Sequence, residues 1–409
     1  MSLAEAFRKH VSRFKDPRLK EEKVPEVGYP TGYLGIDFLN GAYIHVSPDG
    51  GDTFFYPSIG LVDGSYIQLI GRSGAGKSTL AIQIAANIVR PFPDAVVFED
   101  QTEAGTMESR KDSITGFYGM ELKKRFITRD NGITSENVYQ RIKIIHDEKI
   151  NNPDKYLYNT GFLDTMGNPI HKFIPTVYIV DSIAMLVPDN QADEDELSGQ
   201  MGASAIAKTN TAVFKKILSK LKAANIILIG VNHILDDIQM GYVKKQAQLR
   251  YLKEGERLPG GKIVNYSATN VLRLDDYKDK TDDKYGLNGA ATIKLSMVKS
   301  RTNISGTSIP MILDSNGFDS ELSLLEYLDE HELIDHRASK YWLKMNPEMT
   351  FTRKNFKNMM ATDPEFKQMF TQASFDALLP LIKEPISQYD DTMDCITNDI
   401  LTMLGKIKK

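Results

Sequence analysis

The sequence predicts an α/β fold with a mostly parallel central sheet that helices flank on both faces. Apolar segments of strand length alternate with helical segments, a pattern typical of a parallel sheet that is buried on both sides. These strands are expected at 66–70, 95–98, 176–180, 226–231, 270–274, 291–298 and 308–313. A glycine-rich motif for phosphate binding stands between the first strand and a helix, which is the place such a motif takes in this type of sheet.

The order of segments predicts a core with additions at both ends. Residues 1–30 are expected to form a polar, basic N-terminal arm, which is either a solvated helix or a docking and polymerisation element. Residues 31–335 form the core, with an irregular hairpin at 41–63, an insertion at 150–175 and helices at 80–90, 135–149, 200–223 and 320–335. Residues 340–409 are rich in Met and Phe and are expected to form a small helical C-terminal domain.

Composition limits the possible functions of the chain. The 409 residues carry a formal net charge of −4, so contact with nucleic acid requires a local basic patch. A single cysteine, Cys395, excludes an intrachain disulfide and fits a reducing cytoplasm. No apolar run reaches membrane-spanning length, and the N-terminus lacks the apolar core of a signal peptide, so we expect a cytoplasmic protein without a membrane partner.

The phosphate-binding motif predicts a nucleoside triphosphate site with Mg²⁺. It consists of Gly71, Arg72, Ser73, Gly74, Ala75, Gly76, Lys77, Ser78 and Thr79 and fits G-x-x-x-x-G-K-[ST]. Glycines let backbone N–H groups cradle phosphate oxygens, Lys77 adds a positive charge at the β- and γ-phosphates, and the Ser78 hydroxyl can bind Mg²⁺. The helix that follows the loop points its positive end at the same anion.

Carboxylates at strand ends are candidates for the hydrolytic chemistry. Asp181 closes the strand 176–180, where it can hold Mg²⁺ through water. The residue that activates water is expected after the strand 95–98, where Glu99, Asp100 and Glu103 compete. The residues alone do not choose between Glu103 and Glu99.

Two further strand ends carry polar side chains. Asn232 and His233 follow the strand 226–231 and either contact the γ-phosphate or cap the strand. Lys299 and Arg301 stand at the end of the strand 291–298, and strand alternation places both on one face. Two cations on one face can reach a phosphate across a subunit interface, as arginine fingers do.

The segment 234–262 is basic and carries tyrosines at 242 and 251. Its candidate DNA-binding residues are Lys244, Lys245, Arg250, Lys253, Arg257, Gly260, Gly261 and Lys262. Cations with interleaved aromatic rings suit single-stranded nucleic acid, although acidic residues dilute the charge and a solvated loop explains the pattern as well.

Read in order, these motifs resemble the RecA-type recombinases, most closely the UvsX-like recombinases of tailed bacteriophages. The resemblance covers roughly residues 30–335, with a weaker similarity to 380. The segments that carry it, besides the phosphate loop, are 31–37, 60–64, 180–186, Gln200-Met201-Gly202, Asn232-His233, Gly260-Gly261-Lys262, 298–302 and 363–370. The chain departs from the family in its Asp-x-Glu motif, because Asp100 is followed by Gln101 and Thr102, and Glu103 comes one position late.

The resemblance implies residue roles within a RecA-like ATPase core. Arg110, counted from Glu103, falls where the family often stacks an adenine, which favours Glu103 as the catalytic base with Glu99 as the alternate. Asn232 and His233 would sense the γ-phosphate, and Lys299 and Arg301 would act on the ATP of the neighbouring subunit. The DNA loops would be 187–200, which is acidic here, and 234–261, on which we place the DNA contact.

The implied function is ATP-dependent DNA strand exchange during recombination and repair. The protein would form helical homo-oligomeric filaments on single-stranded DNA, pair it with homologous duplex DNA and work with loading proteins in an infected bacterial cell. ATP and Mg²⁺ would be the cofactors. The alternatives are a ring helicase of the same fold and a non-catalytic ATP-binding filament scaffold.

Overall fold

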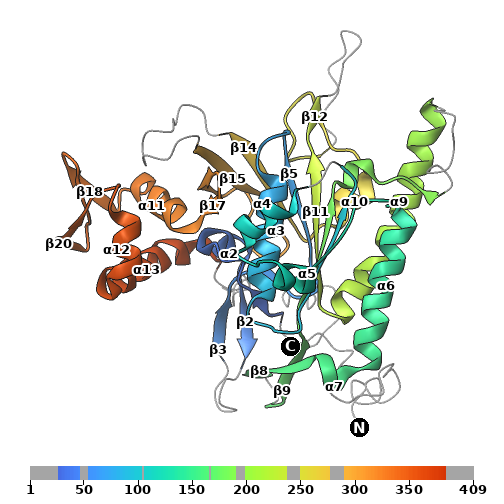
Figure 1. The fold of residues 1–409 in the computed structure, drawn as a ribbon, viewed down its shortest axis with the longest axis horizontal. Helices are drawn as coiled ribbons and strands as arrows, with labels where there is room; N and C mark the ends of the chain where they lie inside the picture. Colours follow the sequence, from blue (N-terminus) through green and yellow to red (C-terminus); the bar gives the residue numbers. More distant parts are fainter. Residues whose placement is uncertain are drawn as a thin grey trace, which may run out of the picture.

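A nine-stranded sheet forms the centre of the protein (Figure 1). The computed structural model describes residues 26–46, 54–103, 106–164, 167–189, 199–236, 249–276 and 290–383. The strand order is β17-β16-β15-β14-β5-β11-β10-β6-β7. In chain order the strands are β5 Tyr66–Gly71, β6 Val97–Gln101, β7 Phe126–Arg129, β10 Thr176–Asp181, β11 Ile226–His233, β14 Asn270–Asp276, β15 Ala291–Lys299, β16 Ser308–Asp314 and β17 Gly317–Asp319.

The direction of the strands determines where a site can form. The strands β7, β6, β10, β11, β5 and β14 are parallel, so their C-terminal ends meet at one edge of the sheet. The remaining strands β15, β16 and β17 continue the sheet in antiparallel pairs. The predicted mostly parallel α/β sheet is therefore confirmed, and the phosphate loop, Asp181 and His233 all lie at the same edge.

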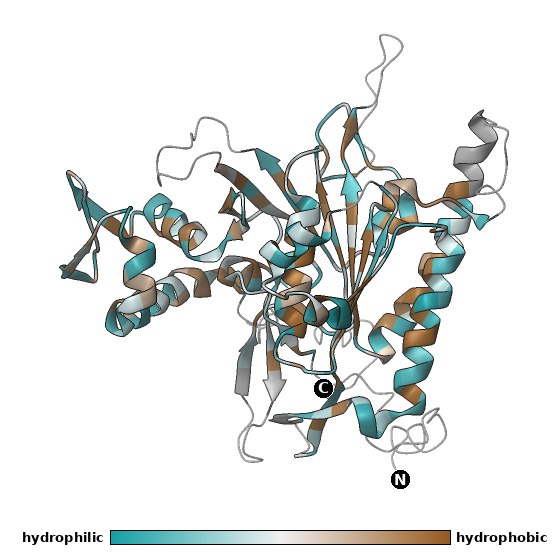
Figure 2. Cartoon of the chain, in the orientation of Figure 1, coloured by the Kyte–Doolittle hydropathy of each residue, from teal (hydrophilic) through white to brown (hydrophobic). Residues whose placement is uncertain are grey.

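Helices cover both faces of this sheet because the side chains of its central strands alternate between two apolar clusters. In β5, Ile67 and Leu69 join the cluster under the helices α3 (Lys77–Val89), α4 (Glu108–Thr115) and α5 (Met120–Arg125). Tyr66 and Ile70 join the cluster under α6 (Ser135–Asn151), α9 (Gly199–Ala223) and α10 (Lys262–Ser267). Hydrophobic residues accordingly follow one another along the buried central strands, which are largely brown in Figure 2.

Two hairpins extend from the edge of the core that lies opposite the C-terminal ends of the parallel strands. The first joins β2 (Ala42–Val46) to β3 (Phe54–Ser58), and the second joins β8 (Leu157–Leu163) to β9 (Pro169–Phe173), as expected for the segments 41–63 and 150–175. A buried ion pair between Lys172 and Asp63, 2.8 Å long, anchors the second hairpin to the core. The hydroxyls of Tyr29 and Tyr158 also share a hydrogen bond of 2.9 Å. The insertion is thus a fixed part of the core.

The remaining elements of the core are short. They are β1 Gly28–Tyr29 paired with β4 Leu61–Val62, α2 Leu34–Asn40, α7 Pro153–Tyr156, η1 Ile183–Met185, and β12 Leu235–Asp236 paired with β13 Glu256–Arg257. The expected helix at 320–335 ends earlier, as α11 (Ser320–Glu330). Most of the predicted N-terminal arm lies outside the described residues. None of the described helices combines the length and apolar character that a membrane span requires.

The C-terminal segment, predicted to be a helical domain from 340, contains strands as well as helices. A three-stranded antiparallel sheet of β18 (Ile334–Arg337), β19 (Lys340–Leu343) and β20 (Asn346–Phe351) precedes the helices α12 (Phe356–Thr362) and α13 (Pro364–Leu378) and the turn η3 (Leu379–Leu381). Phe351 of β20 packs against Phe356 and Phe366 of these helices. Strands of four to six residues leave a weak alternation pattern, and the Phe and Met content reflects the core that sheet and helices share.

A buried carboxylate in α2 predicts a pH dependence of stability. Asp37 is 3% exposed and accepts hydrogen bonds from the Thr31 backbone N–H and hydroxyl, each 2.6 Å long. Burial raises the pKa of Asp37 to about 7 despite these hydrogen bonds. Between pH 4 and 7 the folded chain therefore holds a proton that the unfolded chain has released, and this contribution to stability is lost as the pH rises through 7.

We expect the free energy of unfolding of the wild type to fall by about 2–3 kcal/mol more than that of Asp37→Asn between pH 5 and pH 8. Urea denaturation at both pH values measures this difference. Asp130→Asn, at an exposed position, is the matched control and should behave as the wild type. An Asp37→Asn protein with the pH dependence of the wild type would contradict the prediction.

Candidate nucleotide site and adjoining basic segment

The phosphate loop connects β5 to α3, and a hydrogen bond to the loop backbone orients the side chain of its lysine. Lys77 begins α3, is 4% exposed and donates a hydrogen bond of 2.6 Å from Nζ to the carbonyl oxygen of Arg72. Burial lowers the pKa of Lys77, and the nearby Asp181 and Glu103 carboxylates partly counteract this effect. The buried ammonium therefore lies among two carboxylates and a loop carbonyl, where the triphosphate of a nucleotide would supply a better counter-charge.

Gly76 shows why the loop needs glycine. Its φ of +82° lies in the left-handed region, and a Cβ there would come within 2.9 Å of the Phe318 ring. Phe318 belongs to the β16–β17 hairpin, and the turn of this hairpin also accepts a hydrogen bond of 3.0 Å from Arg110 to the Ser315 carbonyl. The exposed Arg110 side chain and the phosphate loop therefore flank the same hairpin, a placement compatible with the predicted adenine contact.

Asp181 and Ser78 lie together, as a magnesium site requires. Asp181 ends β10, and the Ser78 side chain lies beside its carboxylate. Burial raises the pKa of Asp181, while Ser78 and His233 favour its charged form. A hydroxyl beside a carboxylate provides the hard oxygen ligands that Mg²⁺ prefers, so Ser78 and Asp181 fit this ion. Bound there, Mg²⁺ would neutralise charge on the phosphates.

The tertiary structure separates the three competing carboxylates, of which Glu99 and Asp100 lie within β6 and Glu103 follows it. Glu99 is 2% exposed, pairs with Lys111 over 2.5 Å and accepts a hydrogen bond of 2.7 Å from Gln101. Asp100 pairs with Arg141 and Tyr178.

Glu103 instead faces the end of β10 and β11. Its Oε1 accepts a hydrogen bond of 2.5 Å from the Ser182 hydroxyl and lies 3.1 Å from His233 Nε2. The Glu103 side chain is 40% exposed, whereas Glu99 and Asp100 are buried, so Glu103 is the one of the three carboxylates that is open to solvent.

The end of β11 contacts both Glu103 and the basic segment, residues 234–262. His233 faces Glu103, whereas the buried Asn232 donates a hydrogen bond of 3.2 Å to the carbonyl oxygen of Pro259. Pro259 precedes Gly260 and Gly261, whose φ values of +92° and +94° turn the chain into α10. Two adjacent residues of one strand thus connect the nucleotide site to the end of the predicted DNA loop.

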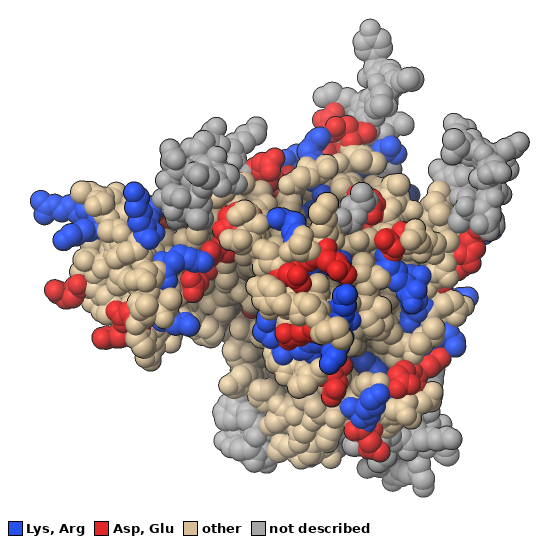
Figure 3. Space-filling view, in the orientation of Figure 1, with Lys and Arg blue, Asp and Glu red and all other residues tan. Residues whose placement is uncertain are grey.

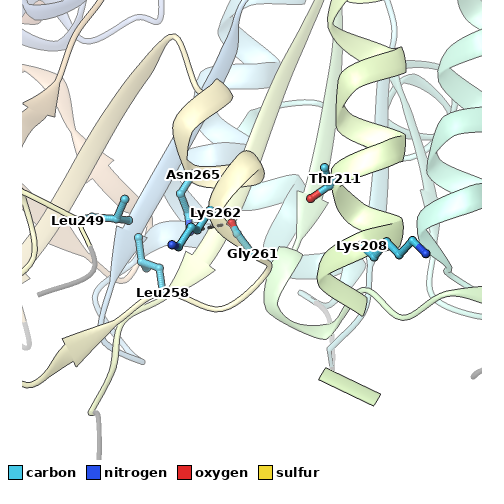
Figure 4. A pocket seen from close by; sticks show the side chains of 7 residues that line it. All are labelled: Lys208, Thr211, Leu249, Leu258, Gly261, Lys262 and Asn265. Atoms are coloured by element: carbon cyan, nitrogen blue, oxygen red, sulfur yellow. Dashed lines mark hydrogen bonds between the residues drawn. The ribbon is translucent and has the colours of Figure 1, made fainter. Parts of the chain in front are cut away.

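An open hollow lies between this loop end and α9 (Figure 4). Its volume is about 520 Å³, and Lys208 and Thr211 of α9 line one side. Gly261, Lys262 and Asn265 line the other side, and Asn265 donates a hydrogen bond of 3.2 Å to the Gly261 carbonyl. Lys208 and Lys262 are both exposed, so two cations flank the hollow.

The other predicted DNA-binding residues fall in two groups. Arg250, Lys253 and Arg257 are exposed at the base of the segment. Lys244, Lys245 and most of the first loop, 190–198, lie outside the described residues.

Lys299 and Arg301 lie close together, as predicted, but away from the phosphate loop of their own chain. Both donate to the carbonyl oxygen of Tyr266, over 2.7 and 2.8 Å. Because β15 runs antiparallel to β14, and β14 parallel to β5, their strand end is at the edge opposite the phosphate loop. Lys299 also contacts the Asn265 and Ala268 carbonyls, and burial lowers its pKa to about 8.

Sequence reasoning missed the contacts that hold the site together. Ser182 and Thr102 connect the ends of β10 and β6. The Thr102 N–H donates a hydrogen bond of 2.7 Å to the Asp181 carbonyl oxygen, and the Ser182 N–H donates one of 2.7 Å to the Thr102 hydroxyl. Ion pairs also surround the basic segment: Arg72 with Asp236 and Arg273 with Glu256. Partners so distant in sequence leave no spacing signal.

Comparison of the chain with models of known protein families and with curated proteins finds no match. The assignments at this site therefore depend on the geometry and chemistry of its residues.

Proposed function

We propose that the protein is an ATP-dependent DNA strand-exchange recombinase that forms filaments on single-stranded DNA. The single observation that supports it most is the end of β11, where His233 faces Glu103 and Asn232 holds Pro259. A γ-phosphate that moves Glu103 or His233 would also shift the neighbouring Asn232 and, through it, the end of the basic segment. DNA bound to this segment would change the position of Glu103 by the same contacts. Such reciprocity is what a DNA-dependent ATPase requires.

In this proposal each residue has a defined task. Lys77 and the loop amides bind the phosphates, Ser78 and Asp181 hold Mg²⁺, and Glu103 takes the proton of the attacking water. Lys208, Lys262 and the exposed arginines at the base of the segment neutralise DNA phosphates. Acidic and basic side chains are interspersed over the face of the core in Figure 3, so DNA contact depends on this local set of cations.

The placement of Lys299 and Arg301 supports a filament. Cations at one edge of the sheet and a phosphate loop at the opposite edge meet only when two molecules pack head to tail. Such a heterologous contact repeats without closing unless its rotation happens to form a ring, so it builds filaments.

The test measures ATP hydrolysis and binding to a single-stranded oligonucleotide across a salt series. Single-stranded DNA should stimulate turnover, and Lys77→Ala should abolish it. Arg257→Gln with Lys262→Gln should weaken DNA binding and reduce the slope of log K against log salt by about 1.4, roughly 0.7 for each lost phosphate contact. The matched control is Lys123→Gln with Lys124→Gln on α5, also exposed lysines. ATP turnover that DNA leaves unchanged at low salt would overturn the proposal.

A further inference from the structure

A bidentate ion pair joins the phosphate loop to the base of the basic segment. Arg72 contacts Asp236 through two hydrogen bonds, Nη2 to Oδ1 at 2.6 Å and Nη1 to Oδ2 at 3.1 Å. The Arg72 guanidinium lowers the pKa of Asp236, so the carboxylate is charged at neutral pH. Bidentate geometry distinguishes this pair from most exposed ion pairs, which contribute little.

Asp236 belongs to the short ladder that closes the segment. Leu235 and Asp236 of β12 pair with Arg257 and Glu256 of β13, so both ends of the segment meet there. Glu256 is buried and makes a bidentate ion pair of 2.7 and 2.8 Å with Arg273 of β14. One end of the segment is thus held by the sheet, and the other is held by the phosphate loop.

The same loop residue also holds the lysine that meets the phosphates. The Arg72 carbonyl accepts the hydrogen bond from Lys77 Nζ, while the Arg72 side chain pairs with Asp236. A γ-phosphate competes with this carbonyl for the ammonium. Rearrangement of the Arg72 peptide would therefore be transmitted through its side chain to Asp236 and the ladder.

We infer that Arg72 and Asp236 couple the nucleotide site to the basic segment, by a route separate from the contacts of Asn232 and His233. Asp236 is a positioning residue in this scheme, because it acts on the ladder and touches no nucleotide. The inference rests on the proposed function, since it assumes that the segment binds DNA.

The experiment measures coupling, defined as the ratio of single-stranded DNA affinities with and without a non-hydrolysable ATP analogue. Fluorescence anisotropy with a labelled oligonucleotide gives both affinities, and analogue binding with and without DNA must give the same ratio. In Asp236→Asn we expect the ratio to fall two- to fivefold, in keeping with an exposed ion pair, while affinity for the analogue without DNA is unchanged.

A double-mutant cycle with Arg72→Gln makes the test specific. If the two side chains act as a pair, Arg72→Gln lowers the ratio by a similar factor and the double variant lowers it no further. The matched control is Asp376→Asn, an exposed acid of α13 that accepts a hydrogen bond from Gln372, and here the ratio should not change.

Three outcomes overturn the inference. An Asp236→Asn protein with the coupling ratio of the wild type, or single effects that multiply in the double variant, would exclude the pair while leaving the proposed function intact. A wild-type protein without any coupling would overturn both.

Discussion

Replacing Glu103 with Gln is expected to lower DNA-stimulated ATP turnover by about 10²- to 10⁴-fold, the usual contribution of a general base. Glutamine keeps the size of the side chain and its contact with Ser182 but cannot take a proton from water. Binding of the ATP analogue should persist, because the phosphate loop is unchanged. Steady-state turnover and analogue affinity together test the role.

Glu99→Gln is the informative comparison, because it makes the same chemical change on the neighbouring carboxylate. It leaves the buried Lys111 without its charged partner, which is expected to cost about 3–5 kcal/mol of stability. Turnover per folded molecule should nevertheless remain near that of the wild type. A larger loss of turnover per folded molecule in Glu99→Gln than in Glu103→Gln would reverse the assignment. Equal, near-background rates in all three proteins would support the non-catalytic scaffold.

Mixing two inactive variants is expected to restore ATP turnover. Lys77→Ala lacks the phosphate-binding lysine but keeps its cations, and Arg301→Ala keeps an intact loop but lacks a cation for its neighbour. In a randomly mixed 1:1 filament an intact loop faces intact cations at about one junction in four, so about a quarter of wild-type turnover should return. Arg301 is the better choice than Lys299, since the Lys299 ammonium contacts three carbonyls at the end of α10.

The control mixes Lys77→Ala with a variant that carries both substitutions. This mixture has no intact loop and should stay inactive. If the first mixture also stays at the background of its components, while each variant still binds DNA, Arg301 does not act across a subunit interface.

Local features of this protein can be predicted from its sequence alone. The phosphate loop is contiguous, so its spacing alone located it between β5 and α3. The core strands were predictable because burial on both faces leaves continuous apolar runs. Asp181 and His233 each end one of these apolar runs, so their position at the C-terminal edge of the parallel strands could also be predicted.

The C-terminal sheet could not be predicted in this way. The strands β18, β19 and β20 have four to six residues and mixed polarity, and the aromatic side chains that stabilise them also belong to helices. The Phe and Met content of this segment therefore predicted helices but gave no indication of the strands.

Tertiary contacts, and not sequence spacing, distinguish Glu99 from Glu103. Glu99 and Glu103 are four residues apart and both follow the predicted strand 95–98, so spacing alone allows either side chain to reach the nucleotide. The partner of Glu99 is Lys111 of α4, whereas Glu103 contacts Ser182, which follows β10, and His233 of β11. Contacts between distant segments have no sequence period, and these contacts separate the buried ion pair of Glu99 from the partly exposed Glu103. The ion pair of Arg72 with Asp236 was hidden for the same reason.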